Sequence, residues 1–186
     1  MSWLDDVDIQ FECNDLISMN VNAIVCPATI NLEDYGRISK KIFDLGGSHL
    51  IKDIISTREK LSNHSLSLGQ AISLECKPHY NIGNFDRLIF VALWAFHSEY
   101  NHNLFYKAYI NSFREAFRYN LKSLALPVMA YDGCLKICGQ AILEVFQGLD
   151  RLKKSSEFPV NEVFFVTTDR NHIDLLKREV EPKLYY

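Results

Sequence analysis

The stretch Asn20–Gly36 limits most strongly what this chain can fold into. Val21 and the residues at 23–25 form a short apolar run, which predicts a buried strand. Pro27 cannot donate a hydrogen bond to a sheet, so we expect the strand to end there. After a polar segment, apolar residues recur at helical spacing as far as Gly46–Gly47, which predicts a helix and its stop. A strand, a loop at its carboxyl end and a helix form the unit at which open α/β sheets bind ligands.

The rest of the chain repeats this alternation of strands and helices. Apolar patterns predict further strands near 8–13, 68–76, 88–93, 122–126 and 162–168. Helical spacing predicts a second helix from Ser48 and others over 103–119, over 137–149 and from a cap at Asn171. We therefore expect a single domain over residues 1–186, with an α/β fold in which three α/β/α layers surround a central mixed, mostly parallel sheet.

Three loops are expected to meet at one edge of this sheet. They follow Cys13, Val25 and Leu126, and the carboxyl ends of parallel strands lie side by side at one edge. This edge is the predicted binding site, because ligand sites in such folds form where loops converge beyond the strand ends.

Composition narrows the class of protein. The 186 residues are 48% hydrophobic, which is enough for one sizeable core. A formal net charge of −3 gives no long-range attraction to nucleic acid or to an anionic membrane. The first residues have no basic and apolar leader pattern, and no apolar run approaches membrane-spanning length. We expect a cytoplasmic protein with no membrane partner.

The cysteines fit reduced structural thiols. Their number is five, which is odd, and they are spread through the chain. Cys134 and Cys138 are one helical turn apart, but a metal site would need two further ligands, and the six histidines show no paired spacing. We expect no metal site and no cofactor.

Four short segments carry a family resemblance. Asn14-Asp15-Leu16 is similar to Gly-Asp-Ile, and Ala23–Thr29 is similar to Ala-Ile-Val-Asn-Ala-Ala-Asn. Leu68–Ala71 is similar to Thr-Gly-Glu-Ala, and Leu121–Pro127 is similar to Leu-Lys-Ser-Ile-Ala-Phe-Pro. Through these segments the chain resembles the macrodomains over nearly its whole length. That family binds ADP-ribose and related nucleotides, and some of its branches hydrolyse ADP-ribosyl bonds or deacetylate O-acetyl-ADP-ribose.

The resemblance implies contacts in the first loops, with departures. Asp15 takes the place of the acceptor for the adenine amino group. Thr29 falls where the family has an Asn that reaches the distal ribose, and one hydroxyl cannot offer an amide's donor and acceptor together. Tyr35–Ile38 replaces Gly-Gly-Gly-Val, so the residues beside Gly36 narrow the phosphate cradle. Arg37 is either a solvated charge or a phosphate ligand.

Ala130–Leu135 takes the place of the second phosphate loop of the family, Ser-Thr-Gly-Ile-Tyr-Gly. Backbone amides can hold a phosphate whatever the side chains are, so this loop can still bind one. Asp132 within it is either a turn residue beside Gly133 or a general base that activates water. Cys134 is a weaker nucleophile candidate, because no histidine is near it in the sequence.

The resemblance thus implies a set of site residues and leaves three functional hypotheses open. The catalytic candidate is Asp132, and the ligand-binding candidates are Asp15, Leu16, Thr29, Asn31, Tyr35, Gly36, Arg37, Ile38, Ala130, Tyr131, Gly133, Cys134, Leu135 and Thr168. The leading hypothesis is a reader or sensor of ADP-ribose or a related nucleotide, with ADP-ribosylated protein or nucleic acid as further partners. The alternatives are an ADP-ribosyl hydrolase with a variant site, for which we expect weak or absent turnover, and a degenerate macrodomain that acts as an interaction module.

Overall fold

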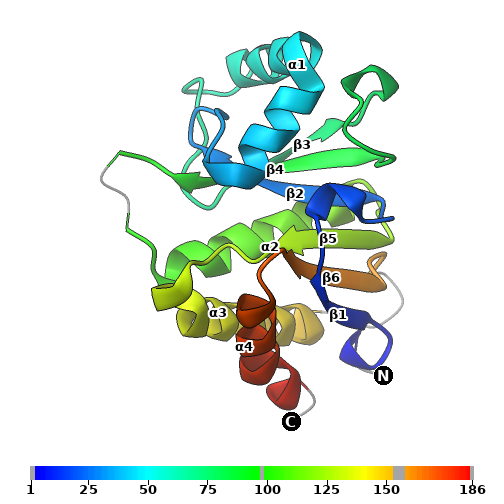
Figure 1. Ribbon diagram of the computed structural model, residues 1–186, viewed down its shortest axis with the longest axis vertical. Coiled ribbons are helices and arrows are strands. Elements are labelled where there is room, and N and C mark those ends of the chain that lie inside the picture. The colour runs from blue at the N-terminus through cyan, green and yellow to red at the C-terminus, as the bar shows by residue number, and fades with distance from the viewer. Residues whose placement is uncertain (1–2, 97–98, 153–157, 185–186) are drawn as a thin grey trace.

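Six strands form one mixed sheet in the computed structural model, which describes residues 3–96, 99–152 and 158–184 (Figure 1). The sheet has the order β1-β6-β5-β2-β4-β3, and only the pair β3 and β4 is antiparallel among its described pairings. The strands are β1 (Asp8–Cys13), β2 (Ala23–Thr29), β3 (Ala71–Glu75), β4 (Arg87–Trp94), β5 (Ser123–Pro127) and β6 (Glu162–Thr167). The carboxyl ends of five strands therefore share one edge of the sheet.

Helices cover both faces of the sheet. The helices are α1 (Gly36–Glu59), α2 (His102–Arg118), α3 (Leu135–Leu152) and α4 (Arg170–Val180). Residues of α1 join one buried cluster, and residues of α2, α3 and α4 join the other. Within β5, Leu124 and Leu126 belong to the second cluster and Ala125 to the first, as expected for a strand buried on both faces. The predicted α/β/α sandwich is confirmed.

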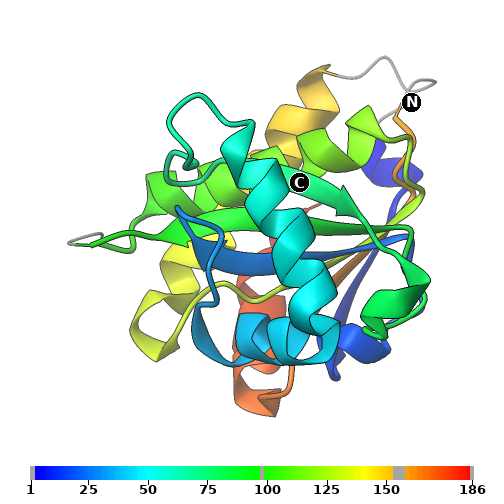
Figure 2. The same cartoon turned by 90° about the horizontal axis from the view of Figure 1, so that it is seen from above.

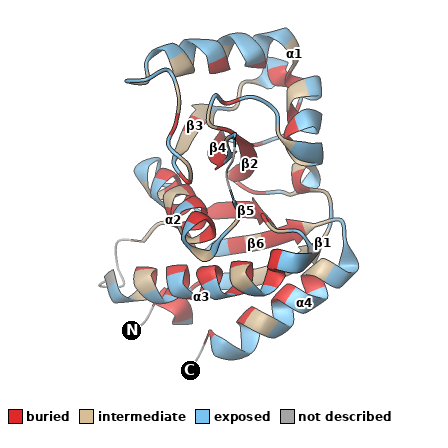
Figure 3. Ribbon diagram, turned by 90° about the vertical axis from the view of Figure 1, so that its left-hand side faces the viewer, coloured by how far each residue is buried: buried red, intermediate tan, exposed pale blue. Residues whose placement is uncertain are grey.

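The views agree with this layering. Figure 2 shows α1 lying across one face of the sheet. Figure 3 shows inner strands such as β2 and β5 as mostly buried, whereas the edge strand β3 is mostly intermediate and the outer surfaces of the helices are exposed. In the described part of the chain, no helix is long and apolar enough to cross a bilayer.

The prediction that the strand at 21–26 ends at Pro27 is wrong. Strand β2 continues through Pro27 to Thr29 and pairs with β4 over that length. Its pairing with β5, in contrast, covers only Ala23 and Ile24. Pro27 thus lies where β2 has no ladder partner on the β5 side, so its missing N–H breaks no hydrogen bond there. The sheet opens between these two strands.

One predicted helix boundary is confirmed and another is wrong. The predicted stop at Gly46–Gly47 is confirmed, because Gly47 has a non-helical φ of 54° and ψ of −151° and divides α1 into two helical stretches across a kink. Helix α4 is capped by Asp169 and not by Asn171, since the Asp169 carboxylate accepts hydrogen bonds from the backbone N–H groups of Asn171 and His172 at 2.9 and 3.3 Å.

Candidate functional site

A cavity of about 620 Å³ lies at the carboxyl edge of the sheet. Segments that follow β1, β2, β4, β5 and β6 line it, so the three loops predicted to meet there are together. Its volume is in the range of about 300–1,000 Å³ that is usual for ligand pockets. We call it the carboxyl-edge cavity. In the order of the strands, residues after β1 lie at one end of it and residues after β4 lie at the other.

Asp15 forms the β1 end of the carboxyl-edge cavity. Its carboxylate caps the short turn η2 (Leu16–Ser18) by accepting a hydrogen bond from the Ile17 N–H at 3.3 Å. The other carboxylate oxygen forms an ion pair with Lys41 of α1. Each oxygen has two lone pairs, so both contacts leave acceptor capacity on the cavity side. The sequence at this turn therefore presents a fixed anion that can still accept a hydrogen bond.

The start of α1 forms the middle of the cavity and carries its cations. Gly36 has a φ of 76°, and because a side chain would meet open space there, the backbone conformation is what requires glycine. Arg37 and Lys41, one helical turn apart, both line the cavity. Among the described residues Arg37 forms no ion pair, and the helix start adds its own positive potential. This arrangement favours an anion such as a phosphate.

Three tyrosines, Tyr35, Tyr100 and Tyr131, form an aromatic wall at the β4 end. The hydroxyls of Tyr35 and Tyr100 are hydrogen-bonded to each other. Tyr100 also meets Tyr131 edge to face, with ring centroids 5.5 Å apart at 77°. Because the three residues come from the segments after β2, β4 and β5, the wall joins three separate loops.

Further rings stand behind the aromatic wall and hold it in place. Tyr35 stacks on Trp94 at 5.8 Å, and Tyr100 stacks on Phe105 at 5.7 Å. Burial, followed by the hydrogen bond with Tyr35, raises the pKa of Tyr100 above its usual value. The hydrogen bond with Cys134 raises the pKa of Tyr131. Both phenols therefore stay neutral at physiological pH.

A buried tyrosine of α2 fixes the loop that follows β5. The Tyr109 hydroxyl accepts a hydrogen bond from the Met129 N–H at 3.1 Å and donates to the Pro127 carbonyl at 3.3 Å. It also lies 3.3 Å from the Cys138 sulfur. Burial raises the pKa of Tyr109 well above the usual value for tyrosine, and burial raises that of Cys138 to about 12. Met129 and Ala130 are in this way held against the cavity.

The segment after β6 completes the lining. Thr168 and His172 face the carboxyl-edge cavity, and His172 lies in the first turn of α4. Its Nε2 is 3.8 Å from the Asp169 carboxylate that caps this helix. His172 thus adds a third basic side chain to the cavity.

Nine of the residues proposed from the sequence line the carboxyl-edge cavity. They are Asp15, Leu16, Tyr35, Gly36, Arg37, Ile38, Ala130, Tyr131 and Thr168. The other ligand candidates, Thr29, Asn31, Gly133, Cys134 and Leu135, lie outside its lining. Asp132 begins the turn η4 (Asp132–Cys134), and its side chain lies outside the described part of the structure.

Thr29 has a local structural role. Its hydroxyl accepts a hydrogen bond from the Glu33 N–H at 3.1 Å, and its N–H donates to the Glu33 carbonyl at the same distance. Its carbonyl accepts from the Leu32 N–H at 2.9 Å. The side chain is nearly buried. Thr29 therefore stabilises the turn that leads to α1, and its hydroxyl is engaged there. Asn31 in this turn is exposed, and its carbonyl accepts from Arg58.

Sequence reasoning missed Lys41, Tyr100 and His172. Lys41 had a usable signal, because it follows Arg37 by one helical turn and so shares its face. His172 follows Thr168 by four residues at the start of a helix, which is a weaker signal of the same kind. Tyr100 lies in the aromatic segment from Trp94 to His102, which shows no period from which its direction can be read.

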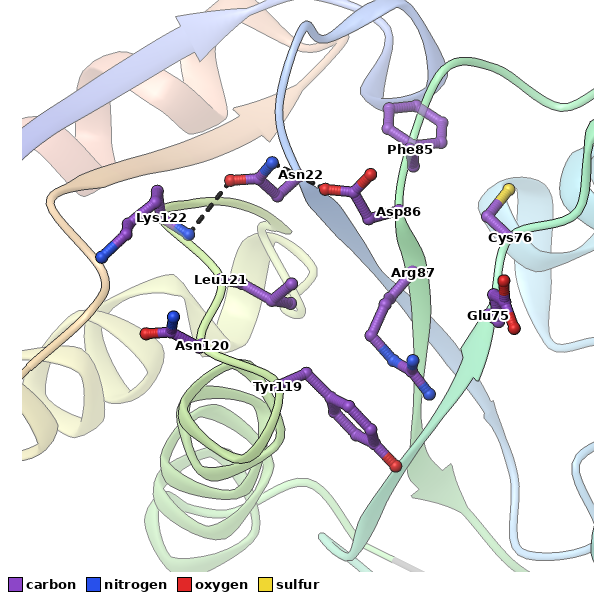
Figure 4. Close-up of a pocket in the computed structure, with 10 residues that line it drawn as sticks. All are labelled: Asn22, Glu75, Cys76, Phe85, Asp86, Arg87, Tyr119, Asn120, Leu121 and Lys122. Carbon is purple, nitrogen blue, oxygen red and sulfur yellow. Dashed lines mark hydrogen bonds between the residues drawn. The ribbon is translucent and has the colours of Figure 1, made fainter.

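A second cavity, of about 440 Å³, lies at the opposite, amino edge of the sheet (Figure 4). Asn22 joins the strands there, since its side chain accepts from the Lys122 N–H at 3.0 Å and donates to Asp86 at 2.7 Å. Arg87 lies over the Tyr119 ring, 3.4 Å from its centroid. These bonds tie the starts of β2, β4 and β5, so the residues of this amino-edge cavity have structural partners.

All five cysteines are free thiols. Among the described residues, no three His, Cys, Asp or Glu side chains gather closely enough to hold a metal ion. The carboxyl-edge cavity therefore offers a carboxylate, basic groups and phenols, which together suit recognition of a polar, anionic organic ligand.

Comparison with solved structures assigns the fold. A mutant of the Oceanobacillus iheyensis macrodomain with ADPR superposes with a TM-score of 0.78 at 17% identity, over 98% of this chain and 97% of that one. The O. iheyensis macrodomain with ADP gives 0.77 at 18% identity, over 98% and 94%. The macro domain of ganglioside induced differentiation associated protein 2 gives 0.71 at 19% identity, over 98% and 94%. The chain thus has the macrodomain fold, in a sequence that has diverged far from these structures.

The sequence alone shows no such match. No protein-family model matches the chain, and no curated protein does so. The predicted likeness to macrodomains is confirmed at the level of the fold.

Proposed function

We propose that this protein binds ADP-ribose or a related nucleotide in the carboxyl-edge cavity and acts as a reader or sensor of it. One observation carries the proposal: Arg37 and Lys41 lie beside Gly36 at the start of α1, next to the acceptor Asp15. A diphosphate needs cations and free backbone N–H groups, and an adenine amino group needs an acceptor. The lining of the carboxyl-edge cavity offers cations at the start of α1 for the diphosphate and the Asp15 carboxylate for the amino group.

In the proposed complex the ligand lies along the carboxyl edge of the sheet. The adenine lies at the β1 end, where its amino group donates to Asp15. The diphosphate lies at the start of α1, where Arg37 and Lys41 neutralise its charge. The distal ribose then lies toward the aromatic wall, where phenol hydroxyls can exchange hydrogen bonds with sugar hydroxyls.

Structures of the same fold support the choice of ligand. One O. iheyensis macrodomain structure contains ADPR and another contains ADP, and a Trypanosoma brucei macrodomain is in complex with ADP. The last has a TM-score of 0.71 at 10% identity. The five free thiols support a cytoplasmic location, because such thiols persist in reducing compartments.

Isothermal titration calorimetry with ADP-ribose tests the proposal. We expect saturable binding by the wild type and a loss of about tenfold or more in affinity for Arg37→Gln, because a charge-assisted hydrogen bond is removed. Lys52→Gln is the matched control, since Lys52 is an exposed cation on α1 outside the cavity lining. Absence of binding by the wild type would contradict the proposal and favour an interaction module.

A hydrolysis assay separates binding from catalysis. We expect turnover of an ADP-ribosylated substrate to stay near background, because the Thr29 hydroxyl is engaged in its own turn and the distal ribose loses that contact. A misplacement of about 1 Å can cost about a hundredfold in rate. Turnover well above background would instead favour the hydrolase, and loss of that turnover in Asp132→Ala with retained binding would assign Asp132 as its base.

A further inference from the structure

The aromatic wall lines one end of the carboxyl-edge cavity. The segments that follow five parallel strands line this cavity. Tyr100 follows β4, which is the last of these five strands in the sheet order. Tyr35 and Tyr131 come from the segments after the two neighbouring parallel strands, β2 and β5. A ligand that extends from the β1 end toward β4 therefore meets these rings last.

The wall is a connected structure. The Tyr35–Tyr100 hydroxyl contact joins residues that are 65 positions apart in the sequence, and Tyr131 meets Tyr100 edge to face. Trp94 and Phe105 stack behind it, so movement of either phenol out of the path would separate stacked rings. Aromatic pairs of this kind contribute beyond their buried area, which favours the closed arrangement.

The wall also keeps its hydrogen bonding over the physiological pH range. Burial raises the pKa of Tyr100, so its hydroxyl remains protonated and able to donate. The groups that raise the pKa of Tyr100, besides burial, are the phenols of Tyr35 and Tyr131 and the Cys134 thiol. The contact between Tyr35 and Tyr100 therefore does not depend on a carboxylate or an imidazole that titrates near neutral pH.

We propose that the Tyr35–Tyr100 contact makes this cavity selective for free ADP-ribose, which ends at the distal ribose, over an ADP-ribosyl group attached to protein. The inference rests on the proposed function, since it takes the adenine to lie at the Asp15 end. An attached ADP-ribosyl group continues beyond the distal ribose, and that continuation runs into the wall. Such a steric block is a direct way for a site to reject a competing ligand.

The experiment compares two ligands and three kinds of variant by calorimetry. Free ADP-ribose and a mono-ADP-ribosylated peptide are titrated into the wild type, Tyr35→Phe, Tyr100→Phe and Tyr100→Ala. The Phe variants remove the hydroxyl contact and keep the rings, while Tyr100→Ala opens the wall. Tyr119→Ala is the matched control, because this half-exposed tyrosine lies at the amino edge of the sheet (Figure 4).

We expect the wild type to bind free ADP-ribose at least about tenfold more tightly than the peptide. Tyr100→Ala should bring the two affinities together, the Phe variants should give an intermediate ratio, and the control should keep the wild-type ratio. Equal affinities in the wild type would overturn the inference and leave the proposed function standing. An unchanged ratio in Tyr100→Ala would overturn the role of the wall. If the wild type bound neither free ADP-ribose nor the peptide, both the inference and the proposed function would be overturned.

Discussion

Removing the Asp15 carboxylate should separate base recognition from phosphate recognition. In Asp15→Ala the proposed acceptor for the adenine amino group is lost. A hydrogen bond that involves a charged group contributes about 1.5–3 kcal/mol, so the affinity for ADP-ribose should fall roughly tenfold to a hundredfold. Ribose 5-phosphate has no base, and its affinity should change little.

Two other contacts of Asp15 are also lost in Asp15→Ala. Their effects cancel in the ratio of the affinities for ADP-ribose and ribose 5-phosphate. The ion pair with Lys41 is exposed, with 41% of the Asp15 side chain accessible, so it contributes at most about 1 kcal/mol. The cap on Ile17 contributes about 1 kcal/mol to the stability of the turn. Both affect each ligand alike, because they change Lys41 and the turn, not the base.

Calorimetry with ADP-ribose and ribose 5-phosphate measures this ratio. Asp15→Asn is the matched variant, because its amide oxygen can still cap the turn and accept a hydrogen bond, although without charge. We expect the affinity ratio of Asp15→Asn to lie between those of the wild type and Asp15→Ala. An equal loss for both ligands in Asp15→Ala would refute the reasoning, and it would mean that Asp15 acts by holding the turn.

Three further predictions concern charge, packing and pH. Lys41→Gln should lower the affinity for ADP-ribose about tenfold and leave that for adenosine nearly unchanged, which calorimetry with both ligands measures. Tyr109→Phe leaves the buried Met129 N–H without its acceptor, so thermal unfolding should show a loss of about 1–3 kcal/mol; an unchanged melting temperature would contradict this. The hydrogen bond from Lys77 lowers the pKa of Asp53, so this pair stabilises the fold above the unfolded pKa of about 3.9 and its contribution is lost as the pH falls below that value. Asp53→Asn should therefore show a smaller loss of unfolding free energy on acidification than the wild type in urea titrations.

The fold could be predicted because its signals are local and repeated. The apolar runs at 88–93 and 122–126 match β4 and β5 closely, since strands buried on both faces need continuous apolar residues. The end of β2 could not be read in this way. Pro27 is compatible with a strand only because the sheet opens beside it, and that opening depends on how β5 is placed.

The location of the candidate site could be predicted, but its chemistry could be predicted only in part. The carboxyl ends of parallel strands lie at one edge of the sheet, so a parallel sheet predicts that the loops after Cys13 and Leu126 converge. The Tyr35–Tyr100 contact and the Asp15–Lys41 ion pair join distant segments, and no local pattern encodes them. Thr29 was expected near the ligand from family position, whereas its hydroxyl is used by the turn.

The central claim is that ADP-ribose binds at the carboxyl edge of the sheet, and backbone amide chemical shifts in an NMR titration test it most directly. The account predicts that ADP-ribose shifts the amides of residues 14–17, 35–38, 128–131 and 167–172, which line the carboxyl-edge cavity or lie within its segments. The amide chemical shifts of Asn22, Asp86 and Arg87 at the amino edge should not change. Shifts confined to the amino edge, or no shifts at saturating ligand, would contradict the account.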